Sequence, residues 1–217
     1  MINGIIFDFN GTILWDTELH NYAWDRFLDN HNIVLSDKEK DVVIHGKSNY
    51  EIFRALFGKK IGDSEVNRLS EEKESLYRKL CMTANLQLAD GCIELFEQCN
   101  KRKIPIAIAT SSLRENVDFY ITTFHLKNWF TEDTIIYSDG KIKSKPDPEM
   151  FNIAAERLKV NTENVIIFED SFAGIKAAEN AKAGEIIIVN SSKNNYYRSN
   201  YKVITSFREI DLEEILS

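Results

Sequence analysis

Five short apolar runs stand out along the chain, and each one ends at a polar residue. A run that is apolar at consecutive positions and rich in isoleucine, valine and phenylalanine is typical of a strand buried on both faces, as in a parallel sheet. We therefore predict strands over residues 5–7, 104–109, 134–137, 165–168 and 186–189, with a candidate edge strand over residues 201–204.

Between these runs, apolar residues recur at the spacing of a helix. From residue 91 onward, helical segments alternate with the strands, which is the signature of a parallel α/β sheet. The stretch over residues 16–88 contains helical patterns without a strong strand. We predict a Rossmann-like α/β core domain over residues 1–15 and 89–217, with an all-α domain inserted over residues 16–88. The helical patterns of the insertion lie at residues 24–28, 52–57 and 69–80.

Composition narrows the possible partners. Hydrophobic residues make up 43% of the chain and charged residues 28%, as in ordinary soluble proteins. The formal net charge of −7 opposes binding to a nucleic-acid backbone, and no stretch approaches the ~20 apolar residues of a membrane span. The cysteines lack metal-ligand spacing and no signal-peptide pattern is present, which favours a cytoplasmic protein with reduced thiols. We expect a monomer without nucleic-acid or membrane partners.

Side chains that carry chemistry stand near the ends of the predicted strands. Asp8 follows the first strand, Thr110 the second, and Glu169 and Asp170 the fourth, while Lys145 lies in the polar loop after the third. In a parallel sheet these ends lie along one edge, where α/β proteins bind their ligands. Each residue alone has an ordinary interpretation, as a helix cap or a solvated loop residue. Their combination favours a shared site.

These side chains suit phosphoryl transfer. A carboxylate can attack phosphorus and form an acyl phosphate, and Asp8 is the candidate. Mg²⁺ prefers one or two carboxylates together with phosphate oxygens and water, and Asp8 and Asp170 supply such carboxylates. Lys145 offers a positive charge to the transferring group, and the Thr110 hydroxyl and Ser111 amide offer hydrogen bonds.

Four motifs follow one another along nearly the whole chain: FDFNGT, ATSS, SKPDP and FEDSFAGI. With them the chain resembles the haloacid dehalogenase superfamily, in the branch of β-phosphoglucomutases and sugar phosphatases. The resemblance implies Mg²⁺ as cofactor and a helical cap over residues 16–88 that closes over the site and excludes water. It implies Asp8 as nucleophile, Thr110, Ser111 and Lys145 as phosphate-binding residues, and Asp8, Asn10, Glu169 and Asp170 as metal-binding residues.

One departure from the family pattern concerns catalysis. Family phosphatases carry a second aspartate two residues after the nucleophile, which protonates the leaving group and then activates water. This chain has Asn10 there, which keeps a backbone carbonyl for the metal but cannot transfer a proton as a carboxylic acid does. Because general acid–base catalysis is worth roughly 10²–10⁴-fold, we expect a slow enzyme unless another group serves. His20 is the nearest candidate in sequence, and its alternative interpretation is an ordinary surface histidine.

A second departure concerns the substrate. The family's phosphoglucomutases hold the second phosphate of the sugar with an arginine after a cap loop, and this chain has Asn49 there. Lys47 and Lys73 are candidates to replace that arginine in part, although a lysine does not copy a bidentate contact. Arg114 is either a ligand for a distal anion or a solvated residue at a helix start. The candidate substrate contacts are His20, Lys47, Lys73, Ser112 and Arg114.

The sequence thus predicts a Mg²⁺-dependent phosphatase that acts on a small phosphorylated metabolite, foremost a sugar phosphate, through an aspartyl phosphate. Two alternatives stay open: a β-phosphoglucomutase, and a phosphate- or metabolite-binding protein that has lost turnover because of Asn10. A response-regulator receiver does not fit, because a helical insertion follows the candidate nucleophile. Dehalogenation does not fit, because it needs no metal and leaves Glu169 and Asp170 unexplained.

Overall fold

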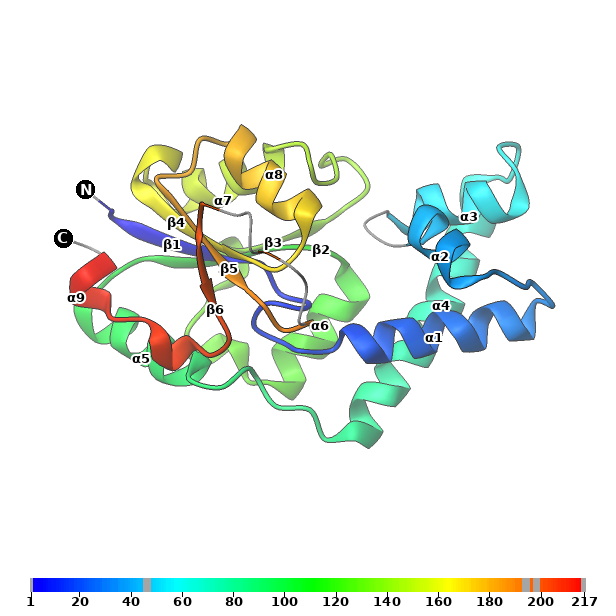
Figure 1. Ribbon diagram of the computed structural model, residues 1–217, viewed down its shortest axis with the longest axis horizontal. Helices are drawn as coiled ribbons and strands as arrows, with labels where there is room; N and C mark the ends of the chain where they lie inside the picture. Colours follow the sequence, from blue (N-terminus) through cyan, green and yellow to red (C-terminus); the bar gives the residue numbers. More distant parts are fainter. Residues whose placement is uncertain (1, 45–47, 193–195, 197–199, 216–217) are drawn as a thin grey trace. The chain divides into compact units, whose positions relative to one another are not determined.

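The computed structural model describes residues 2–44, 48–192, 196 and 200–215. The chain forms two compact units, one of Met1–Trp15 with Gln87–Ser217 and the other of Asp16–Leu86. The first is an α/β unit, and the described residues of the second form helices and their connections (Figure 1). The predicted α/β fold class is therefore confirmed.

A six-stranded parallel sheet forms the centre of the α/β unit, in the order β3-β2-β1-β4-β5-β6. Within it, Ile5 of the central β1 lies beside Ile106 of β2 and Ile166 of β4. Strands in this position are covered on both faces, which explains their consecutive apolar residues. The strands are β1 (Gly4–Phe7), β2 (Ile106–Leu113), β3 (Ile135–Ser138), β4 (Val165–Glu169), β5 (Glu185–Val189) and β6 (Lys202–Ile204).

Helices cover both faces of this sheet (Figure 1). They are α5 (Cys92–Arg102), α6 (Arg114–Thr123), α7 (Glu149–Leu158), α8 (Phe172–Asn180) and α9 (Leu212–Ile215). Helices α7 and α8 lie on one face, and α5, α6 and α9 lie on the other. Where strands and helices alternate along the chain, each strand is thus connected to the next by a helix that covers one face of the sheet, as in other parallel α/β folds.

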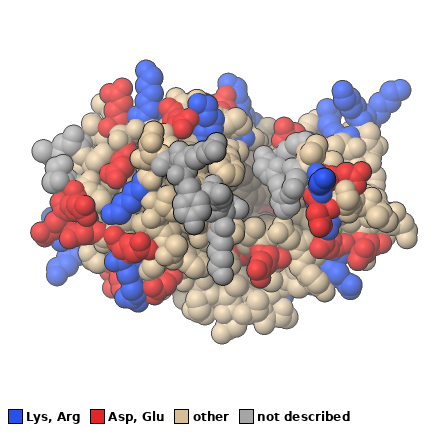
Figure 2. All heavy atoms as spheres, in the orientation of Figure 1, with Lys and Arg blue, Asp and Glu red and all other residues tan. Residues whose placement is uncertain are grey.

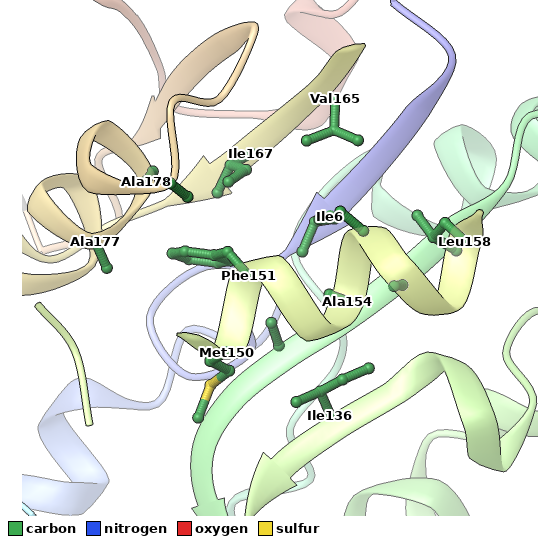
Figure 3. Close-up of a cluster of buried hydrophobic side chains, with 14 of the residues drawn as sticks. Ile6, Ile136, Met150, Phe151, Ala154, Leu158, Val165, Ile167, Ala177 and Ala178 are labelled. Carbon is green, nitrogen blue, oxygen red and sulfur yellow. The ribbon is translucent and has the colours of Figure 1, made fainter. Parts of the chain in front are cut away.

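Successive residues of β1 face opposite layers, as the two-residue period of a strand requires. Ile6 packs in one buried cluster with Phe151 of α7 and with Ala177 and Ala178 of α8 (Figure 3). Phe7 instead stacks on Phe168 of β4, with the ring centroids 5.1 Å apart. Because both faces of β1 are packed, the residue that follows it, Asp8, stands on a rigid support.

The helical unit has a core of its own. Its helices are α1 (Thr17–Asn30), α2 (Asp37–Val43), α3 (Asn49–Phe57) and α4 (Asp63–Ala84). The ring centroids of Trp24 and Phe27 on α1 lie 5.5 and 5.3 Å from that of Phe53 on α3, and Val66 and Leu69 of α4 belong to the same cluster. Each of the three predicted helical patterns therefore contributes buried side chains to one core.

Helix α2 is missing from the predicted set. It has few apolar residues, so periodicity gave no signal. A capping box marks its start instead: the Ser36 side chain accepts from the backbone N–H of Glu39, whose carboxylate accepts from the N–H of Ser36. The same motif begins α3 at Ser48 and Glu51. Serine followed three residues later by glutamate is thus the signal that locates α2.

Strand β2 differs from the predicted strand at both ends. It begins after Pro105, which has no N–H to donate to a sheet, and it runs on to Leu113 past a register shift in its pairing with β3. The prediction that this strand stops at Ala109 is therefore wrong. Thr110 and Ser111 lie inside the strand, in the irregular stretch between Ala109 and Leu113, the residues that pair with β3 on either side of the register shift.

The surface in Figure 2 and the described helices give no sign of a single charged face or of a membrane span. On the face shown in Figure 2, basic and acidic side chains are interspersed. Among the described helices, none is both long and apolar enough to cross a membrane.

All three cysteines are buried free thiols, and burial raises the pKa of Cys81 to about 11. These thiols therefore stay protonated and unreactive near neutral pH.

Candidate active site

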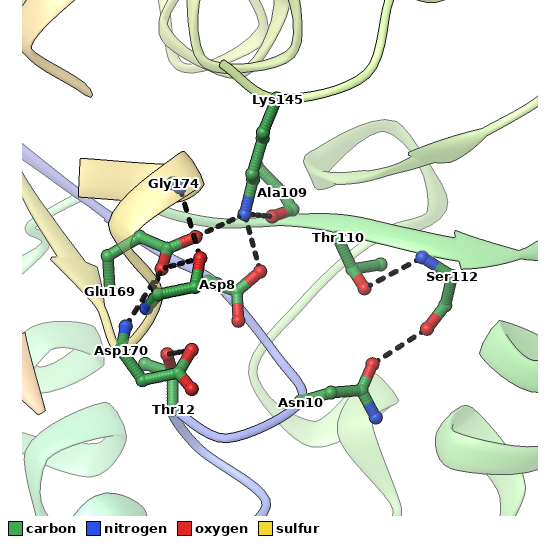
Figure 4. Close-up of polar contacts among 11 residues, drawn as sticks. Asp8, Asn10, Thr12, Ala109, Thr110, Ser112, Lys145, Glu169, Asp170 and Gly174 are labelled. Atoms are coloured by element: carbon green, nitrogen blue, oxygen red, sulfur yellow. Dashed lines mark hydrogen bonds and ion pairs between the residues drawn. The ribbon is translucent and has the colours of Figure 1, made fainter. Parts of the chain in front are cut away.

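Three carboxylates gather where β1 and β4 end side by side. Asp8 follows β1, Glu169 is the last residue of β4, and Asp170 comes next. The register that sets Phe7 beside Phe168 brings these residues to the same edge. One oxygen of each carboxylate lies within 4.8 Å of the others (Figure 4).

Lys145 lies between two of these carboxylates. Its Nζ donates to Oδ1 of Asp8 and to Oε1 of Glu169, each at 2.5 Å, and to the carbonyl of Ala109 at 3.4 Å (Figure 4). Only 7% of the lysine side chain is exposed, so protein oxygens take the place of water around the ammonium. The loop after β3 thus delivers a cation to the carboxylate edge.

Glu169 is tied to the start of α8. Its Oε2 accepts from the N–H of Asp170 at 2.8 Å, from the N–H of Ser171 at 2.7 Å and from the Ser171 hydroxyl at 3.0 Å. Since its Oε1 binds Lys145, protein donors engage both oxygens. Asp170 is half-buried and accepts from the Thr12 hydroxyl at 3.3 Å. Asp170 is therefore better placed than Glu169 to offer an oxygen to a ligand.

Two glycines make room for these carboxylates. A Cβ added to Gly174 would lie 1.7 Å from Oε1 of Glu169, and one added to Gly11 would lie 2.1 Å from Oδ2 of Asp170. Gly11 also has a φ of +81°, which residues with side chains rarely adopt. Any side chain at either position would displace a carboxylate of the cluster.

Replacing Gly174 with alanine is expected to lower the free energy of unfolding by about 1–3 kcal/mol, as overpacking does. In an unconstrained helix the same change is stabilising by about 0.5–1 kcal/mol, so the sign of the effect tests the contact. Urea denaturation of this variant and of Gly62→Ala, whose Cβ meets nothing within 4 Å, measures it. A Gly174→Ala protein as stable as the parent would contradict the contact.

Burial sets the charge of the cluster. Desolvation raises the pKa of Asp8 from 3.8 to about 7, although Lys145 acts in the opposite direction. Desolvation, helped by repulsion from Glu169 and Asp8, raises the pKa of Asp170 well above its usual value. Burial alone would lower the pKa of Lys145, but attraction to Asp8 and Glu169 leaves it raised. A bound cation would relieve this repulsion among buried carboxylates.

The donor set suits a hard cation. The cluster offers carboxylate oxygens alone, which Mg²⁺ and Ca²⁺ prefer, whereas soft metals select thiolates and imidazoles. When all three carboxylates are ionised they face one ammonium, so a divalent ion would balance the charge that Lys145 leaves uncompensated. The residues present therefore fit a divalent metal.

Two hydroxyl groups orient the side chain of Asn10. Ser112 Oγ donates to Asn10 Oδ1 at 2.7 Å, and Asn10 Nδ2 donates to the Tyr120 hydroxyl at 2.9 Å. The Tyr120 ring stacks on Phe9, with centroids 4.3 Å apart. The buried Thr110 hydroxyl accepts from the N–H of Ser112 at 3.1 Å. Residue 10 and the end of β2 thus form one hydrogen-bonded network.

His20 belongs to a polar group inside the helical unit. Its Nδ1 lies 3.0 Å from Nζ of Lys73, its Nε2 lies 3.4 Å from Oδ2 of Asp16, and its ring stacks on Tyr77 with centroids 3.8 Å apart. Lys73 is buried and also pairs with Glu74 at 3.0 Å. His20 is therefore a tightly held, partly buried histidine, and Lys73 is not a solvated lysine.

The other predicted substrate contacts have different settings. Arg114, exposed at the start of α6, donates to Asp118 at 2.8 Å and to the Tyr137 hydroxyl at 3.4 Å. Ser111 is exposed, in contrast to the buried Thr110 before it. Lys47 lies outside the described residues.

The site also contains residues that sequence reasoning did not assign to it. Tyr120 reads as an apolar residue of a helix face, and nothing in its spacing pairs it with Asn10, 110 positions away. Ser171 is the exception, because a serine between a predicted strand and the start of the next helix is a recognisable cap. It caps α8 by accepting from the N–H of Gly174 at 3.0 Å.

Comparison with known proteins places the chain among hydrolases. A family model described as "haloacid dehalogenase-like hydrolase" matches residues 2–182. The phosphorylated carbohydrates phosphatase of Thermotoga maritima is 28% identical over 198 residues, which cover 89% of this chain and 88% of that protein. A HAD hydrolase from Entamoeba histolytica, of family IA variant 3, is 34% identical with a TM-score of 0.89, over 99% of this chain and 98% of that one. A β-phosphoglucomutase from Clostridium difficile is 26% identical with a TM-score of 0.76, over 99% and 96%.

Proposed function

The chain belongs to the haloacid dehalogenase-like hydrolase family, and from this premise we propose that it is a Mg²⁺-dependent phosphatase of small phosphorylated metabolites, in particular of phosphorylated sugars. Its similarity to a phosphatase of phosphorylated carbohydrates supports this substrate class. The observation that carries the proposal is the position of Lys145 between Asp8 and Glu169, with Asp170 beside them.

Asp8 is the nucleophile in this proposal. One of its carboxylate oxygens attacks phosphorus, the bond between phosphorus and the substrate's ester oxygen breaks, and an aspartyl phosphate forms. Water then attacks the phosphorus of this acyl phosphate, which releases inorganic phosphate and regenerates the carboxylate. Lys145 orients Asp8 through Oδ1 and stabilises negative charge on the phosphoryl oxygens. Thr110 and Ser111 donate hydrogen bonds to the same oxygens.

Asp8 and Asp170 would hold Mg²⁺, together with the backbone carbonyl of Asn10 that the family resemblance implies. When bound, the ion supplies positive charge that offsets repulsion between the carboxylate and the phosphoryl group. Glu169 orients its neighbours, because its own oxygens already accept from Lys145, Asp170 and Ser171.

Proton transfer to the leaving group is the step that Asn10 does not serve. Its amide can donate a hydrogen bond but does not give up a proton at neutral pH. His20 remains the nearest candidate donor in sequence, although Lys73 and Asp16 already engage both of its ring nitrogens within the helical unit. Phosphatase activity is better supported than mutase activity. Asn49, which stands where the mutases carry an arginine, donates to Glu74 at 2.9 Å within the helical unit.

A screen of phosphorylated metabolites with Mg²⁺ tests the proposal. We expect inorganic phosphate to be released from sugar phosphates, and release to stop when a chelator removes the metal. β-Glucose 1-phosphate belongs in the panel, because conversion to glucose 6-phosphate would indicate a mutase. A protein that binds phosphate and Mg²⁺ but hydrolyses no member of the panel would overturn the phosphatase assignment.

Asp170→Asn is expected to weaken Mg²⁺ binding by about 100-fold or more, and Glu169→Gln by about 10-fold, because loss of a direct ligand exceeds loss of an outer partner. Glu169 is assigned as the outer partner because both of its carboxylate oxygens already accept hydrogen bonds from protein donors. Calorimetric titration with Mg²⁺ measures both, and Asp133→Asn, at an exposed aspartate outside the cluster, is the matched control. Equal affinities of Asp170→Asn and the parent would refute the assignment.

A further inference from the structure

The segment that follows β5 contacts both loops that carry the acidic cluster. The Ser191 hydroxyl donates to the backbone carbonyl of Gly11 at 2.6 Å. The Tyr196 hydroxyl donates to the backbone carbonyl of Asp170. One bond is made to the loop after β1 and the other to the loop after β4, so two residues that follow β5 bind both loops.

Those two loops are packed against each other. Thr12 donates to the carboxylate of Asp170 at 3.3 Å, and the Cα of Gly11 approaches the same carboxylate so closely that a Cβ would clash. Gly11 is three residues from Asp8. A shift of either backbone would therefore change the separation of the carboxylates of Asp8 and Asp170.

Asn190 and Tyr196 are anchored independently of the cluster. The N–H of Asn190 donates to the carbonyl of Ile204 on β6 at 2.8 Å. Tyr196 is 7% exposed and packs with Ile175 of α8 and Ile188 of β5. Because its ring is fixed in this apolar cluster, the hydroxyl of Tyr196 is presented to Asp170 in one place.

We propose that Ser191 and Tyr196 are positioning residues of the metal site, which keep the loops of Asp8 and Asp170 together before the ion binds. The inference rests on the proposed function, since it concerns the same Mg²⁺. The carboxylates repel one another without a cation, and this repulsion favours separation of the loops. The hydrogen bonds from Ser191 and Tyr196 oppose that separation and so reduce the reorganisation that binding requires.

The test is calorimetric titration with Mg²⁺ in the absence of substrate. We expect Ser191→Ala and Tyr196→Phe each to raise the dissociation constant about 10-fold, the lower range for outer partners of a metal site. Ser191→Thr keeps a hydroxyl and is expected to bind like the parent. Tyr201→Phe is the matched control, because the Tyr201 hydroxyl donates to Glu179 on the surface.

The metal dependence of turnover gives a second readout. The Mg²⁺ concentration for half-maximal activity should rise in Ser191→Ala and Tyr196→Phe, while kcat at saturating Mg²⁺ is retained. Variants that melt at a lower temperature but bind Mg²⁺ as tightly as the parent would show a merely structural role and overturn the inference. Failure of the parent to bind Mg²⁺ would instead overturn the proposed function itself.

Discussion

Phosphate release from every substrate is expected to stop when Asp8 is replaced by alanine. The change removes the proposed nucleophile and one proposed metal ligand at once. We expect a loss of roughly 10⁴-fold or more, since loss of the nucleophile in a covalent hydrolase leaves only catalysis by binding. Lys145 keeps Glu169 as its partner at 2.5 Å, so no buried ammonium is left unpaired and the fold should persist.

Asp8→Asn provides the matched variant, because it keeps the shape of the side chain and removes its charge. It is expected to be equally inactive. Its unfolding temperature without metal should equal or exceed that of the parent, because a buried carboxylate beside Glu169 and Asp170 becomes neutral. Phosphate-release assays and thermal melts followed by circular dichroism measure the two effects. Turnover of a genuine substrate by a folded Asp8→Asn protein would refute the covalent mechanism.

Asn10→Asp is expected to have the opposite effect, with hydrolysis of an alkyl sugar phosphate rising by about 10²-fold or more. Aspartate has the shape of asparagine, and the hydroxyls of Ser112 and Tyr120 that hold the amide can also donate to a carboxylate. The new carboxyl group would protonate the leaving oxygen and afterwards take a proton from the attacking water.

The leaving group supplies the control for this prediction. Acetyl phosphate and p-nitrophenyl phosphate release stable anions that need little protonation, so Asn10→Asp should accelerate their cleavage far less. Breakdown of the aspartyl phosphate can limit turnover, and single-turnover kinetics separates it from the first step. If the alkyl ester is cleaved at the same single-turnover rate with either residue, Asn10 is no handicap. Another residue must then carry the proton, and His20→Gln tests the first candidate.

Much of the site could be predicted because the end of a buried strand can be recognised in a sequence as the end of an apolar run. Asp8, Glu169 and Asp170 each follow or end an apolar run, and parallel pairing of β1 and β4 brings such ends together. Lys145 could be placed at the same edge because its loop follows β3. The roles of these residues remain predictions until the variants are measured.

The remaining features depend on contacts that a sequence does not display. Leu113 extends β2 because β3 lies beside it, and periodicity within the strand contains no record of that partner. Tyr120 and Tyr196 reach the site from distant positions in the chain, and nothing in their spacing pairs them with Asn10 and Asp170. The residues after β5 read simply as a polar loop, because donors to backbone carbonyls need no particular spacing.

The Asn10–Gly11 pair also bears on the chemical ageing of the protein. Asparagine before glycine is prone to deamidation, because the glycine nitrogen can close a ring onto the side-chain amide when the backbone is mobile. In the fold that nitrogen donates to the carbonyl of Leu14 at 2.7 Å, and Ser112 and Tyr120 hold the amide. Folded molecules are thus protected, whereas molecules that have been unfolded and stored gain aspartate or isoaspartate at position 10. Before weak activity is assigned to the asparagine form, peptide mass analysis of the same preparation should therefore measure how much of position 10 has been deamidated.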